Sequence, residues 1–297
     1  MNERIKPKNS VMALYLVPIY LVYLCVFILP VILAIYFSFF NFRTVSSKTF
    51  VGLFNYKKLF TDPLLLSSLK NNLYLVLVCM IGQIGIAFVF ANMLYSRLIN
   101  PKVSNFFRTV IYFPVTLSAV IIGYVWTMIY DYHFGLLNQL LISFGFPDAV
   151  KAWLTDERSI MTVVSIPMIW QYVGFHLVII MAAMTSIDKE VYEMAEIDGA
   201  SGFRKAVSIT FPLIKNTLSV CVLLCVSANM KAFDHILAMT NGGPGYSSSV
   251  LALYAYKISF AENNLGYGNT VSVAIMVVMV IIIAGAKGIM SLFKSKE

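Results

Sequence analysis

Six long, predominantly apolar stretches constrain this 297-residue chain more than any other feature. A helix that crosses the hydrocarbon core of a bilayer needs about 20 apolar residues, because the core is about 30 Å thick and a helix rises about 1.5 Å per residue. Hydrophobic residues make up 59% of the chain and charged residues only 12%. The sequence therefore predicts an all-α integral membrane protein with six transmembrane helices, at residues 11–40, 73–94, 109–130, 160–187, 213–239 and 265–286.

The first stretch is longer than the apolar core of a signal peptide and lacks a small-residue cleavage pattern. We therefore expect it to be a retained span. Pro18 and Pro30 lie within it, and proline removes a helical hydrogen bond. The first span is accordingly expected to be kinked or to extend beyond the bilayer at one end.

Orientation follows from the lysines and arginines between the spans, since cytoplasmic loops are enriched in both. With the N-terminus inside, 13 of them fall on the cytoplasmic side, including Arg97, and eight on the outer side. The bias predicts that both termini are cytoplasmic. The predicted domains are then a cytoplasmic tail at 1–10, a permease domain at 11–290 that includes a cytoplasmic loop at 188–212, and a second tail at 291–297.

The loop at 188–212 is too polar to lie in lipid, and its pattern favours two short helices. Tyr192, Ala195 and Ile197 alternate with acidic residues in a way that suits an amphipathic helix, and Asp198-Gly199 is a natural stop. A second helix is expected to begin near Ser201 and end before Pro212. On the outer side, short interfacial helices are predicted within 53–60, 134–147 and 250–260.

Several other classes of protein fit the sequence poorly. The net charge is +8, but the basic residues form no stripe interleaved with exposed aromatic residues, so we expect no nucleic-acid partner. We assign the charge to basic loops near anionic lipid. The chain has no Walker-type loop, HExxH or GxSxG motif, and no paired carboxylates in a plausible cleft. No catalytic residue, metal site or cofactor of its own is therefore predicted. The four cysteines lie in apolar runs and are interpreted as packing residues.

The polar loop carries a motif, Glu193 to Ala200 followed by Ile209-Thr210-Phe211-Pro212, that resembles the signature of membrane-spanning permeases in carbohydrate-uptake ATP-binding-cassette importers. The larger permease of the maltose transporter and the glycerol-phosphate and oligosaccharide permeases are relatives of this kind. Met194 and Phe211 depart from the family pattern by apolar changes. Further matches extend the resemblance over about residues 50–270: Phe50 to Tyr56, Phe107 to Pro114, Phe134 to Asn138, Trp153 to Thr155 and Thr240 to Pro244.

The resemblance implies that the polar loop is a coupling hairpin that docks on a cytoplasmic ATPase. Its implied contact residues are Glu193, Met194, Ala195, Asp198, Gly199 and Ala200. The resemblance also implies a second homologous permease, two ATPase subunits that bind ATP and Mg, and an extracellular or periplasmic solute-binding protein that delivers a sugar. The expected location is the plasma or inner membrane of a prokaryote, in contact with lipid.

Polar and aromatic residues within the fourth and fifth spans are candidates for the sugar path, because a weak sugar site needs amides beside aromatic rings. The candidates from the residues are Trp170, Gln171, Tyr172, Phe175, Lys231 and Asp234, and the resemblance to the maltose permease implies Asn229 as a further sugar contact. The alternative for Gln171 and its neighbours is helix packing. For Lys231 and Asp234, three residues apart, the alternative to a gate is an ion pair on one helix face.

A second function remains open from the residues: a stand-alone secondary transporter or channel driven by an ion gradient. It is disfavoured by the acidic loop and by the lack of a carboxylate-rich site at mid-membrane. A membrane-bound enzyme is a more distant alternative.

Overall fold

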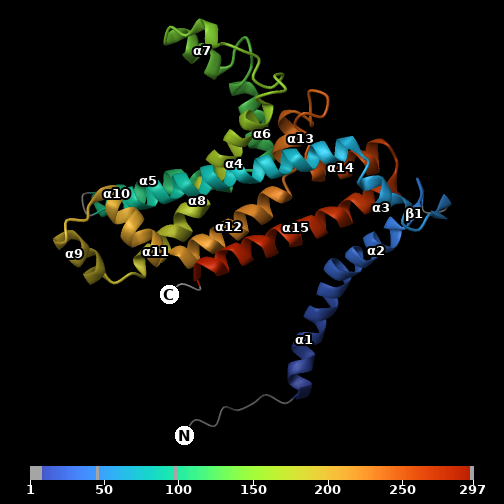
Figure 1. The fold of residues 1–297 in the computed structure, drawn as a ribbon, viewed down its shortest axis with the longest axis horizontal. Coiled ribbons are helices and arrows are strands. Elements are labelled where there is room, and N and C mark those ends of the chain that lie inside the picture. The colour runs from blue at the N-terminus through green and yellow to red at the C-terminus, as the bar shows by residue number, and fades with distance from the viewer. Residues whose placement is uncertain (1–8, 45–46, 97–98, 295–297) are drawn as a thin grey trace. The chain divides into compact units, whose positions relative to one another are not determined.

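The computed structural model describes residues 9–44, 47–96 and 99–294. Residues 1–8 and 295–297, which belong to the predicted tails at 1–10 and 291–297, lie outside the described residues. Arg97, counted above among the cytoplasmic basic residues, also lies outside them. The chain divides into two compact units, Met1–Asp62 with Ala255–Met276, and Pro63–Tyr254 with Val277–Glu297. About three quarters of the described residues are helical, and apart from two short strands the regular elements are all helices, as the sequence predicts (Figure 1).

The first unit contains the first predicted span. One apolar helical run extends over Ser10–Ser38. It is built from α1 (Asn9–Tyr23), a π-helical turn (Leu24–Ile28) and α2 (Leu29–Ser38). The irregularity expected from proline takes the form of that wider turn, which ends two residues before Pro30, a residue that cannot donate a helical hydrogen bond.

Three small elements follow in the same unit, and side-chain amides hold them together. Strands β1 (Phe40–Asn41) and β2 (Thr49–Phe50) pair antiparallel, and α3 (Phe54–Leu59) follows. Asn55 Nδ2 donates to the Ser38 and Phe40 carbonyls at 2.9 and 3.0 Å. Thr270, on the part of α15 (Leu265–Lys294) in this unit, also donates to Ser38 O at 3.1 Å. The carbonyls released where α2 ends are therefore satisfied from within the unit.

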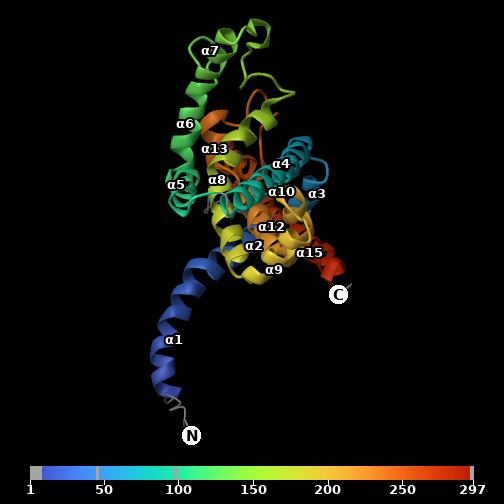
Figure 2. The ribbon, with the colours of Figure 1, turned by 90° about the vertical axis from the view of Figure 1, so that its left-hand side faces the viewer.

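The second unit is a bundle around α8 (Ile160–Thr185), which packs against α4 (Pro63–Leu94), α5 (Pro101–Tyr112) and α12 (Lys215–Met230) (Figure 2). Gly174 lies so close to the backbone of Ile111 and Tyr112 that a Cβ there would collide with it. This glycine allows α8 to approach α5 closely. The remaining elements of the unit are 3-10 turn Phe113–Thr116, α6 (Ala119–Ile129), α7 (Leu136–Ser143), 3-10 turn Pro147–Ala149, α9 (Lys189–Ile197), α10 (Gly202–Lys205), π turn Ala206–Thr210, α11 (Phe211–Leu213), α13 (Asp234–Met239) and α14 (Leu251–Tyr256).

Four helices of the described chain are long and apolar enough to cross a membrane: Ser10–Ser38, Pro63–Leu94, Ile160–Thr185 and Leu265–Gly288. Two bent pairs pass the same test together, Pro101–Thr116 with Ala119–Ile129 at 100° and Gly202–Leu213 with Lys215–Met230 at 80°. If each pair is one span, the chain has the six that the sequence predicts. The third predicted span, 109–130, is thus a broken helix, and the 80° bend of the second pair lies at Ile214, where the fifth predicted span, 213–239, begins. The apolar composition gave no sign of either bend.

The fifth predicted span is interrupted a second time near its end. Helix α12 ends at Met230, and α13 begins at Asp234. Of the two alternatives for Lys231 and Asp234, an ion pair on one helix face does not fit this arrangement, because the helix ends between the two residues. No ion pair joins these two side chains in the part of the chain that the structure describes.

The predicted short helices outside the spans are present at Phe54–Leu59, Leu136–Ser143 and Leu251–Tyr256. Asn138 holds the segment that contains the second of them. Its side chain donates to the Tyr132 and Lys151 carbonyls, both at 3.1 Å, and accepts a bond from Trp153 Nε1 at 2.8 Å. Two motifs that lie apart in the sequence, one around Asn138 and one around Trp153, thus meet in a single hydrogen-bond network.

Asn72 joins three parts of the second unit from a fully buried position on α4. Its Nδ2 donates to Asn229 O, in the last turn of α12, at 3.0 Å. Its Oδ1 accepts from the backbone N–H of Leu251, where α14 begins, at 2.9 Å. Both backbone groups lie in the interior, so the bonds to this one amide satisfy polar groups that water cannot reach.

We predict that Asn72→Ala destabilises the protein by about 2–4 kcal/mol, since it leaves the Leu251 N–H unpaired and removes a partner from Asn229 O. The measurement is the thermal unfolding midpoint of the detergent-solubilised protein. Asn105→Ala, at an exposed position on α5, is the matched control and should leave the midpoint unchanged. Equal midpoints for the two variants would contradict this role of Asn72.

Candidate functional site

The polar loop folds as the predicted helical hairpin, and a glycine closes its turn. Helix α9 ends at Ile197, and Gly199 takes a φ of +78°, which L side chains rarely adopt. The Ala200 N–H donates to Ala195 O at 2.8 Å and the Gly199 N–H to Glu196 O at 3.1 Å. These two bonds satisfy carbonyls at the end of α9 in a Schellman arrangement and reverse the chain within a few residues.

The two faces of the hairpin differ sharply in exposure. Tyr192, Ala195 and Ala200 are buried within the chain. Met194 is 59% exposed, and Ile197, predicted to lie on the buried face, is 85% exposed. The prediction for Ile197 was wrong, because it lies two residues beyond Ala195 and a helix turns that position away from the buried stripe.

The second helix of the hairpin begins at Gly202, close to the predicted Ser201, but does not end before Pro212. Helical structure continues through a π turn at Ala206–Thr210 into α11, whose first turn contains Pro212. Proline is tolerated there because the first helical N–H groups have no intrahelical partner. The hairpin therefore runs directly into the bent fifth span.

Sequence reasoning missed Phe203, the most exposed aromatic residue of the hairpin at 84%. It lies beside Gly202 in the motif's spacer, where no pattern distinguished it. Met194, Ile197 and Phe203 together form what we call the apolar tip of the hairpin. Large exposed apolar side chains on an otherwise charged segment mark an interaction surface.

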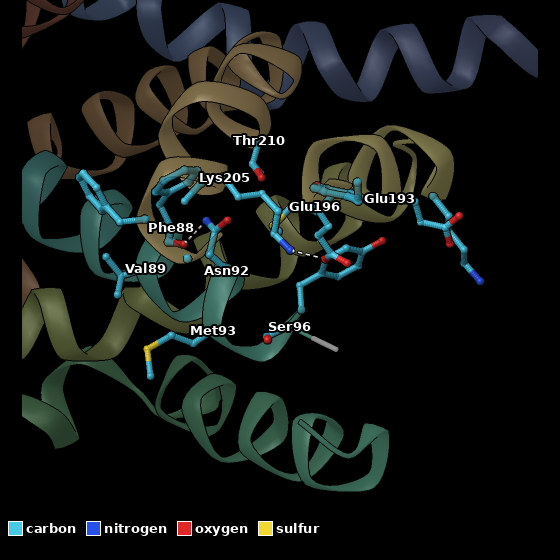
Figure 3. A pocket seen from close by; sticks show the side chains of 16 residues that line it. Phe88, Val89, Asn92, Met93, Ser96, Glu193, Glu196, Lys205 and Thr210 are labelled. Carbon is cyan, nitrogen blue, oxygen red and sulfur yellow. Dashed lines mark hydrogen bonds and ion pairs between the residues drawn. The ribbon is translucent and has the colours of Figure 1, made fainter. Parts of the chain in front are cut away.

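Tyr192 connects the two hairpin helices to the end of α4. Its ring lies 5.7 Å from the Tyr95 ring, and Lys205 Nζ lies 5.7 Å from the centre of the Tyr192 ring. Lys205 also forms an ion pair with Glu196 Oε1 at 2.9 Å (Figure 3). Burial raises the pKa of the Tyr192 hydroxyl, so that it remains a neutral hydrogen-bond donor at physiological pH.

A cavity of about 970 Å³ lies between the hairpin and α4. Figure 3 shows Phe88, Val89 and Met93 of α4 on one side of it and the charged hairpin residues Glu193 and Glu196 on the other. The cavity is thus apolar toward the span and charged toward the hairpin.

Gln171, a predicted sugar contact, is 2% exposed and fully engaged within the chain. Its Nε2 donates to Leu117 O at 2.9 Å, and its Oε1 lies 2.7 Å from His235 Nε2. Leu117 is in the break between the two halves of the bent third span, and His235 is on α13. Gln171 therefore connects α8 with two places where helices are interrupted.

Asn229 is similarly occupied, at 3% exposure. Its Nδ2 donates to Cys225 O at 2.8 Å, one turn back on α12. The neighbouring thiol of Cys225 donates to Gln83 Oε1 on α4 at 3.3 Å. In this conformation the amides of Gln171 and Asn229 act in packing, and their contact with sugar stays a prediction.

The other candidate path residues are more accessible. Trp170 is 46% exposed and packs edge-on against Trp126 at 6.0 Å. Lys231 and Asp234 are exposed, and Tyr172 and Phe175 are half-buried. Asp234 is close enough to Tyr172 to interact with it electrostatically. Tyr172 on α8 and Asp234 on α13 therefore lie near each other.

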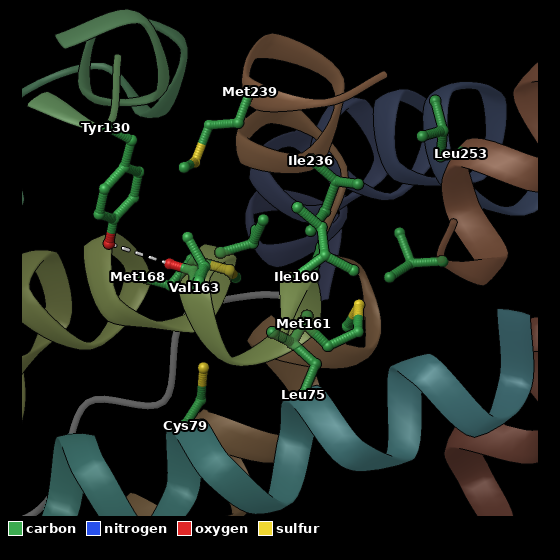
Figure 4. Packing of buried hydrophobic residues seen from close by; sticks show 13 residues of the cluster. Leu75, Cys79, Tyr130, Ile160, Met161, Val163, Met168, Ile236, Met239 and Leu253 are labelled. Atoms are coloured by element: carbon green, nitrogen blue, oxygen red, sulfur yellow. Dashed lines mark hydrogen bonds between the residues drawn. The ribbon is translucent and has the colours of Figure 1, made fainter. Parts of the chain in front are cut away.

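An apolar cluster supports this region from the side. It is formed by α4, α6, α8, α13 and α14, and Tyr130 Oη donates to Val163 O at 3.2 Å beside it (Figure 4). Ile236 on α13 and Leu75 on α4 are fully buried in the cluster. The short helix α13 is therefore held by packing even though the chain breaks before it.

Residues 83–296 match the family described as the binding-protein-dependent transport system inner membrane component. The chain belongs to this family. It is a transport permease subunit that spans the membrane, as the helices of the two units indicate. The function predicted from the hairpin motif, permease of a binding-protein-dependent importer, is confirmed at this level.

Similar proteins agree with the family. The chain is 34% identical over 266 residues to the probable ABC transporter permease protein YurN of Bacillus subtilis, covering 89% of this chain and 90% of that protein. It is 30% identical over 243 residues to the diacetylchitobiose uptake system permease protein NgcF of Streptomyces coelicolor. This match covers 79% of this chain and 69% of that protein. The fold is similar to a bacterial alginate ABC transporter solved with an alginate pentasaccharide-bound periplasmic protein, with a TM-score of 0.81 at 20% identity over 94% and 93% of the two chains.

We predict that Gln171→Leu lowers the thermal unfolding midpoint of the solubilised permease, because it leaves Leu117 O without this donor in the interior. Gln171→Glu retains the acceptor toward His235 and should have a smaller effect if the residue remains protonated. Substrate affinity of the assembled transporter, measured as the concentration for half-maximal uptake, should change less than twofold in Gln171→Glu. An unchanged midpoint with a large loss of substrate affinity would instead make Gln171 a sugar contact.

Proposed function

We propose that this chain is the sugar-conducting permease subunit of an ATP-driven importer. It assembles with a second homologous permease, two cytoplasmic ATPase subunits and an external solute-binding protein. The proposal is supported by family membership and by relatives that include a diacetylchitobiose uptake permease. The similarity to an alginate transporter adds a second saccharide importer with the same fold.

The observation that carries the proposal is the geometry of the hairpin. A closed turn at Gly199 presents Met194, Ile197 and Phe203 outward, beside the carboxylate of Glu193. This combination suits a groove that offers an apolar floor and an arginine, since a charge-assisted bond from arginine to a carboxylate is stronger than a neutral hydrogen bond. Within the hairpin, Asp198 occupies the end of α9, and Ala195 and Ala200 form its buried side.

Energy for transport comes from the partner subunits in this scheme. ATP and Mg are bound and hydrolysed by the ATPases, and this chain performs no chemistry itself. Closure of the ATPases moves the hairpin, and the hairpin's direct continuation into α11 and α12 carries that movement into the bundle. A stand-alone transporter has no use for such a hairpin.

For the sugar path we propose the accessible members of the predicted set. Trp170, Tyr172 and Phe175 offer aromatic faces for the C–H surface of a sugar, and Lys231 and Asp234 offer partners for its hydroxyl groups. Gln171 and Asn229 support these residues from behind in the conformation seen here. Placed in a prokaryotic plasma or inner membrane, the chain has both termini and the hairpin in the cytoplasm.

We predict that Glu193→Ala and Gly199→Asp each reduce substrate-stimulated ATP hydrolysis of the assembled transporter by about tenfold or more. Loss of a charge-assisted bond costs about 1.5–3 kcal/mol, and a tenfold change corresponds to 1.4 kcal/mol. A Cβ at Gly199 meets no atom within 4 Å, so its cost is confined to backbone strain and the added charge. The measurement is ATPase activity in proteoliposomes with and without substrate-loaded binding protein.

Glu190→Ala is the matched control, since Glu190 is an exposed glutamate in the first turn of the same helix. It should retain stimulation. The amount of permease in the membrane should be equal for all three variants. Normal stimulation in both Glu193→Ala and Gly199→Asp would refute docking by the hairpin.

A further inference from the structure

The cavity between α4 and the hairpin lies between the apolar end of a candidate membrane span and the charged side chains of the hairpin. Helix α4 belongs to a candidate span that ends at Leu94, and the cavity is lined by the last turns of that span. Its opposite wall is formed by α9 and α10, which carry Lys189 and Lys205. A molecule that fills the cavity must therefore have an apolar part and a charged part.

One polar group in this cavity has no partner. The Tyr192 hydroxyl is buried near Thr210, and within the described chain it has no hydrogen-bond partner in good geometry. Tyr192 lines the cavity and is itself only 6% exposed. A buried hydroxyl without a partner costs about 1–3 kcal/mol, which a ligand oxygen placed in the cavity would recover.

A second cavity lies next to the first, with Phe88 between them. It has a volume of about 580 Å³ and shares Phe88 with its neighbour. From Phe88 it extends one turn further along α4, past Ile84 and Gly85, and against Leu218 and Val222 of α12. A Cβ at Gly85 would meet no atom within 4 Å, so this glycine borders open space. Lys215, Asn216 and Ser219 also line the second cavity, but most of its exposed wall is apolar, which suits a hydrocarbon chain.

The charges around the first cavity indicate the kind of head group. Two lysines, Lys189 and Lys205, line it together with two glutamates, Glu193 and Glu196. A purely anionic head group would meet the two carboxylates, whereas a zwitterion can place each of its charges beside the opposite sign. A free sugar would leave the second, apolar cavity unused.

We propose that the two cavities together bind one phosphatidylethanolamine molecule. Its phosphate accepts hydrogen bonds from Tyr192 Oη and from Lys205, whose three ammonium hydrogens also serve Glu196. Its amine lies beside the glutamates, and one acyl chain passes Phe88 into the second cavity. The leaflet is the cytoplasmic one, an assignment that rests on the orientation proposed above.

Such a lipid would be a structural part of the coupling region. It contacts α4, α12 and both hairpin helices, including Phe203 of the apolar tip, so its removal loosens the hairpin from the bundle. The lipid composition of the membrane then influences how well movement of the hairpin reaches the spans.

The test uses the complete purified transporter, with its second permease and ATPases, titrated in detergent with dioleoyl phosphatidylethanolamine or dioleoyl phosphatidylglycerol. Bound lipid is counted by native mass spectrometry. Wild type should bind one more phosphatidylethanolamine than Val89→Trp, whose indole fills the first cavity from α4. Tyr192→Phe should weaken that binding by about tenfold, as expected for the loss of one hydrogen bond to a charged group.

Val220→Trp is the control, because Val220 is a half-exposed valine on α12 that lines neither cavity. It should bind as wild type does. Equal lipid counts in wild type and Val89→Trp would overturn the proposal, as would equal binding of phosphatidylglycerol at this site. Co-purification of the ATPases and an unchanged unfolding midpoint show that each variant is folded. Because the readout is lipid stoichiometry, the result is independent of whether the transported solute is a sugar.

Discussion

The structure depends on one constraint: backbone polar groups released by broken helices in an apolar surrounding need partners. The third and fifth spans both break, at 100° and 80°, and a further break separates α12 from α13. In lipid each unsatisfied group would cost several kcal/mol. Side-chain amides on unbroken helices supply these partners. Gln171 on α8 donates to Leu117 O, and Asn72 on α4 donates to Asn229 O and accepts from the Leu251 N–H.

This constraint explains why amides inside the spans are ambiguous from sequence. An amide near the middle of a span predicts a polar ligand as readily as it predicts a backbone partner. Gln171 and Asn229 were candidates for the sugar path, yet both are occupied by neighbours that lie tens of residues away or one turn back. Only the three-dimensional arrangement distinguishes the two uses. For Gln171 the partner carbonyl, Leu117 O, becomes available through a break that composition does not reveal, whereas Asn229 donates to a carbonyl of its own helix.

Much of the fold was nevertheless predictable, since it follows from local rules. Span positions came from apolar length, and the hairpin turn came from Asp198-Gly199, where the structure shows a positive φ at Gly199. The exposure of Ile197 and Phe203 did not follow, because an apolar residue on a short helix usually faces its own protein. The sequence analysis did not predict that helical structure continues through Pro212, because proline usually ends a helix. The π-helical turn that precedes Pro212 could not be recognised from the sequence.

Helix α4 has a property that arises from its length alone. At 32 residues it extends about 48 Å. Near one end Ser68 and Asn71 bond to the segment before α14, through Ser249 and the Ser247 and Ser249 carbonyls. Near the other end Phe88 to Ser96 face the hairpin. A single unbroken rod thus joins the two extremities of the bundle. Tilting it by a few degrees displaces both ends by ångströms in opposite directions, without any relay of side-chain rearrangements between them.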